Sequence, residues 1–193
     1  MTAHRITPLL VVLAMLCAAG PAEAQFARRY AGISGGATYS NLTNYNVANS
    51  DWRWGGTAGL VIGTVTFDYS FVELAPSWTQ QGGSDLRIDY VDIPLLIGGL
   101  IPVGDRDNVF RMYGGIALGL KVACNLDTIC DAAKGSVWSL PVGVSFAKMI
   151  GSGRFIGVDG RYAIGLSDAI DVLRVTSRSW QFRALFGFRL GAR

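Results

Sequence analysis

The chain has 193 residues, of which 50% are hydrophobic and 16% are charged, and its formal net charge is +3. It has no basic run and no basic patch interleaved with aromatic residues, which argues against a nucleic-acid partner. No unbroken apolar stretch of about 18 residues follows residue 24, so this part of the chain is not expected to cross a membrane as helices.

The first 24 residues have the pattern of a signal peptide. Arg5 supplies the positive charge, residues 9–16 form an apolar core, and residues 22–24 (AEA) form the small-x-small triplet that signal peptidase recognises. The apolar core is too short for a transmembrane helix, which needs about 20 residues. A retained N-terminal anchor is the alternative. We expect cleavage of residues 1–24 and export of residues 25–193 through the inner membrane.

Eight segments of β-type sequence follow, separated by turn-rich stretches. No linker or shift in composition divides them, so residues 25–193 are expected to form one domain. A high apolar content without long apolar runs is typical of strands in which apolar residues recur at every second position. The predicted strands are residues 30–40, 54–65, 71–80, 90–101, 110–123, 137–149, 154–166 and 179–190.

The last three segments alternate most clearly. In the eighth, large apolar residues from Trp180 to Leu190 take one face, and Gln181, Arg183, Gly187 and Arg189 take the other. The second face consists largely of small residues with isolated charges, which suits the narrow lumen of a barrel better than a solvated surface. The large residues suit lipid, so the alternation predicts an all-β, eight-stranded antiparallel up-and-down transmembrane β-barrel.

The lengths of the predicted connections agree with this topology. A barrel whose N-terminus lies in the periplasm alternates long external loops with short internal turns. Residues 41–53, 81–89, 124–136 and 167–178 are expected to be external, and the shorter connections 66–70, 102–109 and 150–153 internal.

Four stretches resemble a known family in their order and spacing. They are GISGGATYSNL at 32–42, YVDIPLL at 90–96, GRYAIGLSD at 160–168 and FGFRL at 186–190. The chain resembles bacterial outer-membrane β-barrel domain proteins of the PorT-like, OmpA-like type over nearly all of residues 25–193. The resemblance implies location in the cell outer membrane, contact with outer-membrane lipid and lipopolysaccharide, and delivery by periplasmic chaperones to the outer-membrane assembly machinery. It implies no cofactor and identifies no external ligand or protein partner.

The histidine content argues against an enzyme. The single histidine is His4, inside the predicted signal peptide, so no histidine is available for a catalytic triad, a general base or a metal site. The outer-membrane barrel families that are enzymes use a histidine. We therefore expect neither catalytic nor metal-binding residues in the exported domain.

Cys124 and Cys130 lie in the third expected external connection. Two thiols without a histidine make a poor metal site, and in an oxidising compartment a pair this close favours a disulfide over free thiols. Because the ring would be small, the bond would rigidify the loop and contribute only modestly to stability.

Eight charged residues fall on positions expected to face the lumen. One interpretation is a selectivity ring or a proton path, and the other is a structural network in which the arginines pair with Glu73 and Asp92. The network is favoured because charges buried in a narrow interior must be compensated. The eight residues are Glu73, Asp92, Arg111, Lys121, Asp159, Arg161, Arg183 and Arg189.

The first external connection offers candidate ligand contacts in Asn44, Tyr45, Asn49 and Trp52, although an exposed aromatic there also suits the membrane interface. The leading functional hypothesis is a structural or surface-interaction protein that acts through its external loops. One alternative is a narrow channel or carrier for a small solute. Another is a soluble periplasmic, lipocalin-like barrel that binds a ligand.

The signal-peptide hypothesis predicts that protein isolated from the membrane fraction begins at Gln25, because the small-x-small triplet ends at Ala24. N-terminal sequencing measures this directly. A sequence that begins at Met1 would show that the leader is retained as an anchor.

Overall fold

The computed structural model describes residues 29–44, 51–67, 69–83, 86–104, 107–125, 130, 134–151, 153–168 and 175–191, so the expected signal peptide lies outside the described residues. Most of this part of the chain is β-strand. The strands are β1 (Arg29–Asn44), β2 (Arg53–Phe67), β3 (Ser70–Leu74), β4 (Ser77–Gly83), β5 (Leu86–Pro102), β6 (Asn108–Cys124), β7 (Ser136–Ile150), β8 (Arg154–Gly165) and β9 (Val175–Leu190). Among these residues we find no helix with the length and hydropathy needed to cross a membrane.

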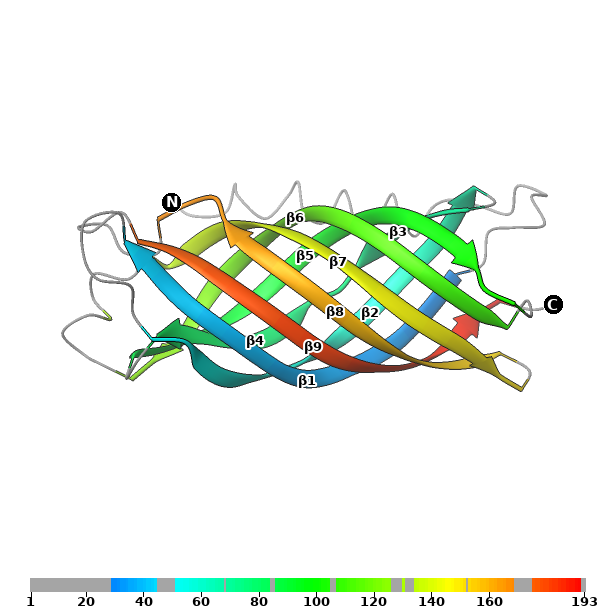
Figure 1. Ribbon diagram of the computed structural model, residues 1–193, viewed down its shortest axis with the longest axis horizontal. Helices are drawn as coiled ribbons and strands as arrows, with labels where there is room; N and C mark the ends of the chain where they lie inside the picture. Colours follow the sequence, from blue (N-terminus) through cyan, green and yellow to red (C-terminus); the bar gives the residue numbers. More distant parts are fainter. Residues whose placement is uncertain are drawn as a thin grey trace, which may run out of the picture.

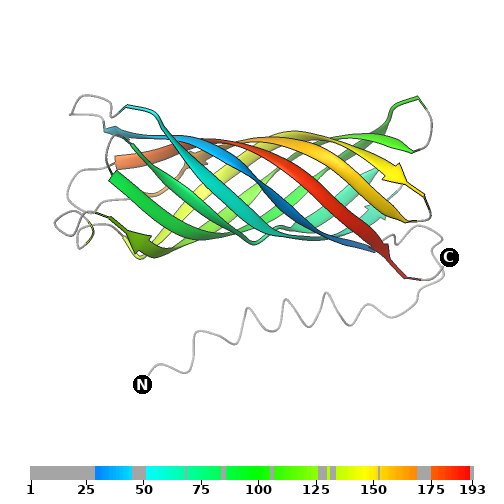
Figure 2. The same ribbon diagram turned by 90° about the horizontal axis from the view of Figure 1, so that it is seen from below.

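The strands close into a barrel with eight positions around the ring. Strands at neighbouring positions pair antiparallel, and β1 pairs with β9 in a continuous register from Arg29↔Leu190 to Asn44↔Val175. Figures 1 and 2 show the strands inclined to the long axis of the barrel, as closure of a sheet requires. The expected eight-stranded up-and-down barrel is confirmed.

The third predicted strand is interrupted. β3 and β4 occupy one position in the ring, since both pair with β2 on one side and with β5 on the other, and Ala75 and Pro76 separate them. Pro76 has no N–H to donate to a ladder. The backbone stays bonded across the break, because Leu60 N donates to Pro76 O at 2.8 Å and Ala75 N donates to Pro94 O at 3.2 Å.

Alternation along the strands separates an apolar exterior from a polar interior. Large apolar side chains such as Ile97 (62% exposed) and Val158 (62% exposed) point outward, whereas Arg161 and Arg183 are buried inside. The orientation expected for a membrane barrel is therefore confirmed. It is opposite to that of the lipocalin-like alternative, whose apolar face would fill the interior.

The two ends of the barrel differ in their connections. At the long-loop end, residues 45–52, 125–135 and 166–174 join strands, while at the short-turn end the connections are 68–69, 103–107 and 151–153. The expectation of a long loop at 81–89 is wrong, because β4 continues to Gly83 and β5 begins at Leu86. Gly82 permits this tight hairpin: its φ is 149°, and a Cβ there would lie 2.0 Å from Leu86 O.

Aromatic side chains gather on the outer surface toward the long-loop end. Trp54 (63% exposed) lies 4.8 Å from the Tyr39 ring, and Trp180 lies 4.6 Å from the Tyr162 ring. Indole and phenol rings favour the boundary between hydrocarbon and water because one edge of each ring is polar. These residues therefore mark one interface of the membrane-spanning zone.

Closure of the ring predicts heat-modifiable electrophoresis. Opening any ladder in detergent or lipid would expose unpaired backbone groups, so the barrel should stay folded in dodecyl sulfate until it is boiled. We expect the unboiled protein to migrate at a different apparent mass from the boiled protein. Identical mobility before and after boiling would contradict a closed barrel.

Candidate functional site

Six of the eight predicted lumen charges lie buried within the barrel. The exposed fraction of each residue is 8% or less, so these groups have little contact with water. Three are acids and three are arginines, and their formal charges cancel. The six are Glu73, Asp92, Arg111, Asp159, Arg161 and Arg183.

The first cluster of this network lies toward the short-turn end. Arg111 Nη2 donates to Glu73 Oε2 and, at 3.2 Å, to the hydroxyl of Tyr30, which itself donates to Glu73 Oε2 at 2.8 Å. The Arg111 guanidinium carbon lies 4.0 Å from the centre of the Phe71 ring. Arg111 is thus held by an ion pair, a hydroxyl and a cation–π contact.

The second cluster is centred on Asp159. Arg183 donates to Asp159 Oδ1 from Nε at 2.9 Å and from Nη2 at 2.5 Å, and the Tyr113 hydroxyl donates to Asp159 Oδ2. Arg161 Nε donates to the same Tyr113 hydroxyl at 3.3 Å. Gly143 leaves room for this hydroxyl, since a Cβ at that position would lie 2.6 Å from it.

The expected pairing of the arginines with Glu73 and Asp92 is correct for Arg111 and wrong for Arg183. Arg183 bonds Asp159 because the two residues are direct partners in the β8–β9 register. Asp92 instead accepts a hydrogen bond from Gln81 Nε2 at 3.3 Å, and the hydroxyl of Ser177 donates to Gln81 Oε1 at 2.8 Å. The Gln81 amide, held by the Ser177 hydroxyl, therefore helps to compensate the buried Asp92 carboxylate. This role was expected of charged groups alone.

Beyond Asp92, the lumen is filled at the long-loop end by apolar side chains. This apolar cap is a cluster of six buried residues with no charged member. Each of the six is at most 9% exposed, so the cap leaves little space for water in this part of the lumen. It consists of Leu42, Leu86, Ile88, Tyr90, Val137 and Val175.

The other two predicted lumen charges lie at opposite ends of the barrel, apart from the buried six. Lys121 is near the long-loop end, where its Nζ donates to the backbone oxygen of Cys130 at 2.7 Å. Arg189 is exposed at the short-turn end. Period-two alternation places a residue on the lumen face but does not show how far along the axis it lies, which is why these two were grouped with the rest.

The candidate residues in the loops are placed only in part. Cys124 and Cys130 are paired, with their Cα atoms 5.8 Å apart, and formation of this disulfide in the exported protein stays a prediction. Trp52 stacks on Tyr39 with ring centres 4.8 Å apart, beside the other aromatics of the interface. Tyr45, Asn49 and the side chain of Asn44 lie outside the described residues. A ligand role for these four residues stays a prediction.

Sequence reasoning missed the uncharged members of the network. Tyr30, Gln81 and Tyr113 each bond a lumen carboxylate, but only charged residues were selected as candidates. Tyr113 lies two residues after Arg111, so the same alternation places both on one face. Selecting every polar residue on the lumen face would have found it.

The described residues offer no arrangement typical of catalysis by a metal. No group of three or more His, Cys, Asp or Glu residues among them is placed to hold an ion. The absence of enzymatic activity stays a prediction.

Residues 9–188 match the family described as outer membrane protein beta-barrel domain. The chain belongs to this family. Outer-membrane barrels keep short turns in the periplasm and longer loops outside the cell, and this orientation would put the apolar cap at the external mouth.

Two solved structures with TM-scores of at least 0.50 share this fold at low sequence identity. OprG, an outer membrane protein of Pseudomonas aeruginosa, is 14% identical with a TM-score of 0.55, and the match covers 89% of this chain and 100% of that one. The N-terminal β-barrel domain of OprF from Pseudomonas aeruginosa is 12% identical with a TM-score of 0.50, covering 81% and 97%. Ail, the attachment invasion locus protein of Yersinia pestis, is 14% identical with a TM-score of 0.45, covering 82% and 98%. A comparison with curated proteins found no match.

Because Asp159 and Arg183 form a buried ion pair, we expect substitutions of these two residues to have strongly coupled effects on the free energy of unfolding. Arg183→Ala leaves Asp159 buried without its cation, which should lower the free energy of unfolding by about 3–5 kcal/mol. The double variant Asp159→Ala/Arg183→Ala removes both charges and should lose much less than the sum of the two single variants. Urea unfolding in lipid vesicles, followed by tryptophan fluorescence, measures these differences.

The matched control is Val158→Ala, on the outer face of the same strand. Val158 is 62% exposed on the barrel surface, where lipid can occupy the space of the deleted methyl groups. Its loss of stability should be far smaller than that of Arg183→Ala. If the double variant lost as much stability as the two single variants together, the two residues would not be a coupled pair.

Proposed function

We propose that this outer-membrane barrel does not conduct solutes and acts through its external connections, as a structural or surface-interaction protein. The observation that carries the proposal is the apolar cap, because it fills the external mouth of the lumen. A solute would have to displace these side chains and then pass the charged clusters beneath them. Hydrophobic constrictions of this kind oppose the passage of water and ions.

The charge network supports the same function. A selectivity filter needs charged groups that a passing ion can reach and leave, as in the charged rings of channels. Here the Glu73 carboxylate is bonded by Arg111 and Tyr30, and the Asp159 carboxylate by Arg183 and Tyr113. These contacts favour a role in filling and bracing the lumen.

The external connections are the part of the barrel available to another molecule outside the cell. The closed wall holds the strand ends at 44, 53, 124, 136, 165 and 175 in fixed positions, and the longer connections join these ends. Loops carried on a rigid scaffold are a common place for recognition. The Cys124–Cys130 pairing would restrict one of them.

Planar-bilayer recording tests the lumen. We expect the folded protein to give no stable current steps under conditions in which a porin inserted by the same procedure conducts. Steps that recur and scale with salt concentration would overturn the proposal in favour of the narrow channel.

The loop role is tested by replacing residues 45–50, 126–133 or 169–174 with glycine-serine linkers, one segment at a time. Adhesion of intact cells to immobilised matrix proteins, glycans and lipopolysaccharide is then measured. We expect one replacement to reduce adhesion to one surface while heat-modifiable mobility is retained. Unchanged adhesion for all three folded variants on every surface would contradict a surface-interaction role.

A further inference from the structure

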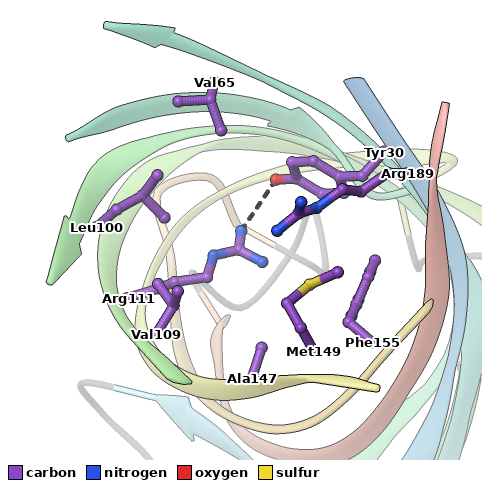
Figure 3. Close-up of a pocket in the computed structure, with 9 residues that line it drawn as sticks. All are labelled: Tyr30, Val65, Leu100, Val109, Arg111, Ala147, Met149, Phe155 and Arg189. Carbon is purple, nitrogen blue, oxygen red and sulfur yellow. Dashed lines mark hydrogen bonds between the residues drawn. The ribbon is translucent and has the colours of Figure 1, made fainter. Parts of the chain in front are cut away.

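The short-turn end of the lumen contains a cavity that the proposed function does not use. Its volume is about 140 Å³ and its wall is almost entirely apolar, with side chains from β2, β5, β6, β7 and β8 (Figure 3). The buried side chains of Phe71, Leu96 and Tyr113 close its inner end, so a ligand would enter from the short-turn end. The apolar wall consists of Val65, Leu100, Val109, Ala147, Met149 and Phe155.

The size and lining of this cavity limit what can occupy it. An engineered protein cavity of about 150 Å³ with an apolar lining binds benzene. A space of about 140 Å³ therefore accepts one six-membered ring or a short alkyl chain. A water molecule would be held poorly there, because it needs about two to four polar partners and the wall offers few. The cavity therefore suits a mainly apolar molecule.

One polar group in the cavity has unused capacity for hydrogen bonding. Arg111 is only 6% exposed, and its hydrogen bonds to Glu73 and to the Tyr30 hydroxyl both come from Nη2. Its Nε has no hydrogen-bond partner, and its Nη1 bonds none of the described residues. Figure 3 shows the second terminal nitrogen of this guanidinium turned away from Tyr30, toward the interior of the cavity. A buried N–H without an acceptor is unfavourable, so an oxygen atom at this position would stabilise the site.

The charges around the cavity favour an uncharged ligand. The Arg111 guanidinium is paired with the Glu73 carboxylate, so the two groups together carry no net charge. An anion beside Arg111 would also lie near the Glu73 carboxylate, and a cation would meet the guanidinium. Neither ion would recover the hydration that it loses on entry. Arg189 is exposed at the rim and already interacts with another group, and it is not needed to hold a neutral molecule.

We propose that this cavity binds a small uncharged carbonyl compound with one ring or short alkyl chain. The carbonyl oxygen accepts a hydrogen bond from Arg111, and the apolar part packs against Met149 and Phe155. One oriented polar contact in an otherwise apolar pocket is the usual arrangement of a small-molecule site. The cavity is closed at its inner end, so the ligand is bound and is not passed through the barrel. This proposal is independent of the function of the external connections.

The two methionines after residue 24 report on binding from two different places. Met149 lines the cavity, and Met112 is 54% exposed on the lipid-facing surface. The protein is labelled with ¹³C-methyl methionine, folded into phosphatidylcholine nanodiscs, and titrated with cyclohexanone. We expect the Met149 methyl signal to shift and saturate while the Met112 signal stays unchanged. A ligand that only dissolves in the lipid would instead shift the Met112 signal.

A charged probe tests the requirement for a neutral ligand. Cyclobutanecarboxylate is similar in size to cyclohexanone but carries a negative charge. It should bind at least about tenfold more weakly, because its carboxylate would lose hydration beside an arginine that is already paired. The shift of the Met149 signal measures both affinities.

Two matched pairs of variants test the cavity and its hydrogen bond. Ala147→Phe fills the cavity and should abolish the saturable shift, whereas Ala184→Phe adds the same group on the lipid-facing surface and should change the affinity by less than about twofold. Arg111→Lys keeps the charge opposite Glu73 but removes the guanidinium, and should weaken cyclohexanone binding at least about fivefold. Arg183→Lys makes the same change outside the cavity and should leave the affinity unchanged. Heat-modifiable mobility confirms that each variant is folded.

Four results would overturn the proposal. The first is a Met149 signal that does not respond to cyclohexanone, or a Met112 signal that shifts equally. The second is a saturable shift that persists in folded Ala147→Phe. The third is binding of cyclobutanecarboxylate as tight as that of cyclohexanone, which would indicate an anion site. The fourth is an equal affinity for cyclohexanone in folded Arg111→Lys and in the unchanged protein.

Discussion

The structure depends on one constraint, which is that a strand in hydrocarbon must find all its backbone hydrogen bonds within the protein. An open sheet would leave the outer edges of β1 and β9 unpaired. Their register from Arg29↔Leu190 to Asn44↔Val175 removes both edges. Even at the break between β3 and β4, Pro76 O and Pro94 O accept hydrogen bonds from Leu60 N and Ala75 N. The hydrogen bonding of the closed barrel therefore continues across the break, although the strand itself is interrupted there.

Closure with eight positions in the ring produces the second constraint, a narrow interior. Small residues such as Gly143 leave room where a side chain lies over the neighbouring strand, as Tyr113 does to bring its hydroxyl to Asp159. Charged groups in this interior have little contact with water and must be compensated by one another. The Arg111–Glu73 and Arg183–Asp159 pairs, with the tyrosines that bond them, are the result. These buried pairs brace the barrel from inside, while its outer surface meets lipid.

The lumen is consequently divided along its axis. The apolar cap fills the long-loop end, the charged clusters occupy the middle, and the short-turn end contains a cavity with a largely apolar wall. Under the proposed function, contacts outside the cell involve the external connections, and the cap and the charged clusters oppose passage through the lumen.

The sequence by itself determined the number of strand positions, the apolar exterior and the burial of residues such as Arg161 and Arg183, because alternation with period two is a local property. Only the tertiary structure decided which groups pair. Asp159 meets Arg183 across 24 residues and Glu73 meets Arg111 across 38, so each contact depends on the register of different strands. The short hairpin at Gly82 was also missed, since polar residues at a strand end resemble a loop. The cavity could not be predicted, because its wall combines residues from both ends of the chain, from Tyr30 to Arg189, that meet only when β1 closes on β9.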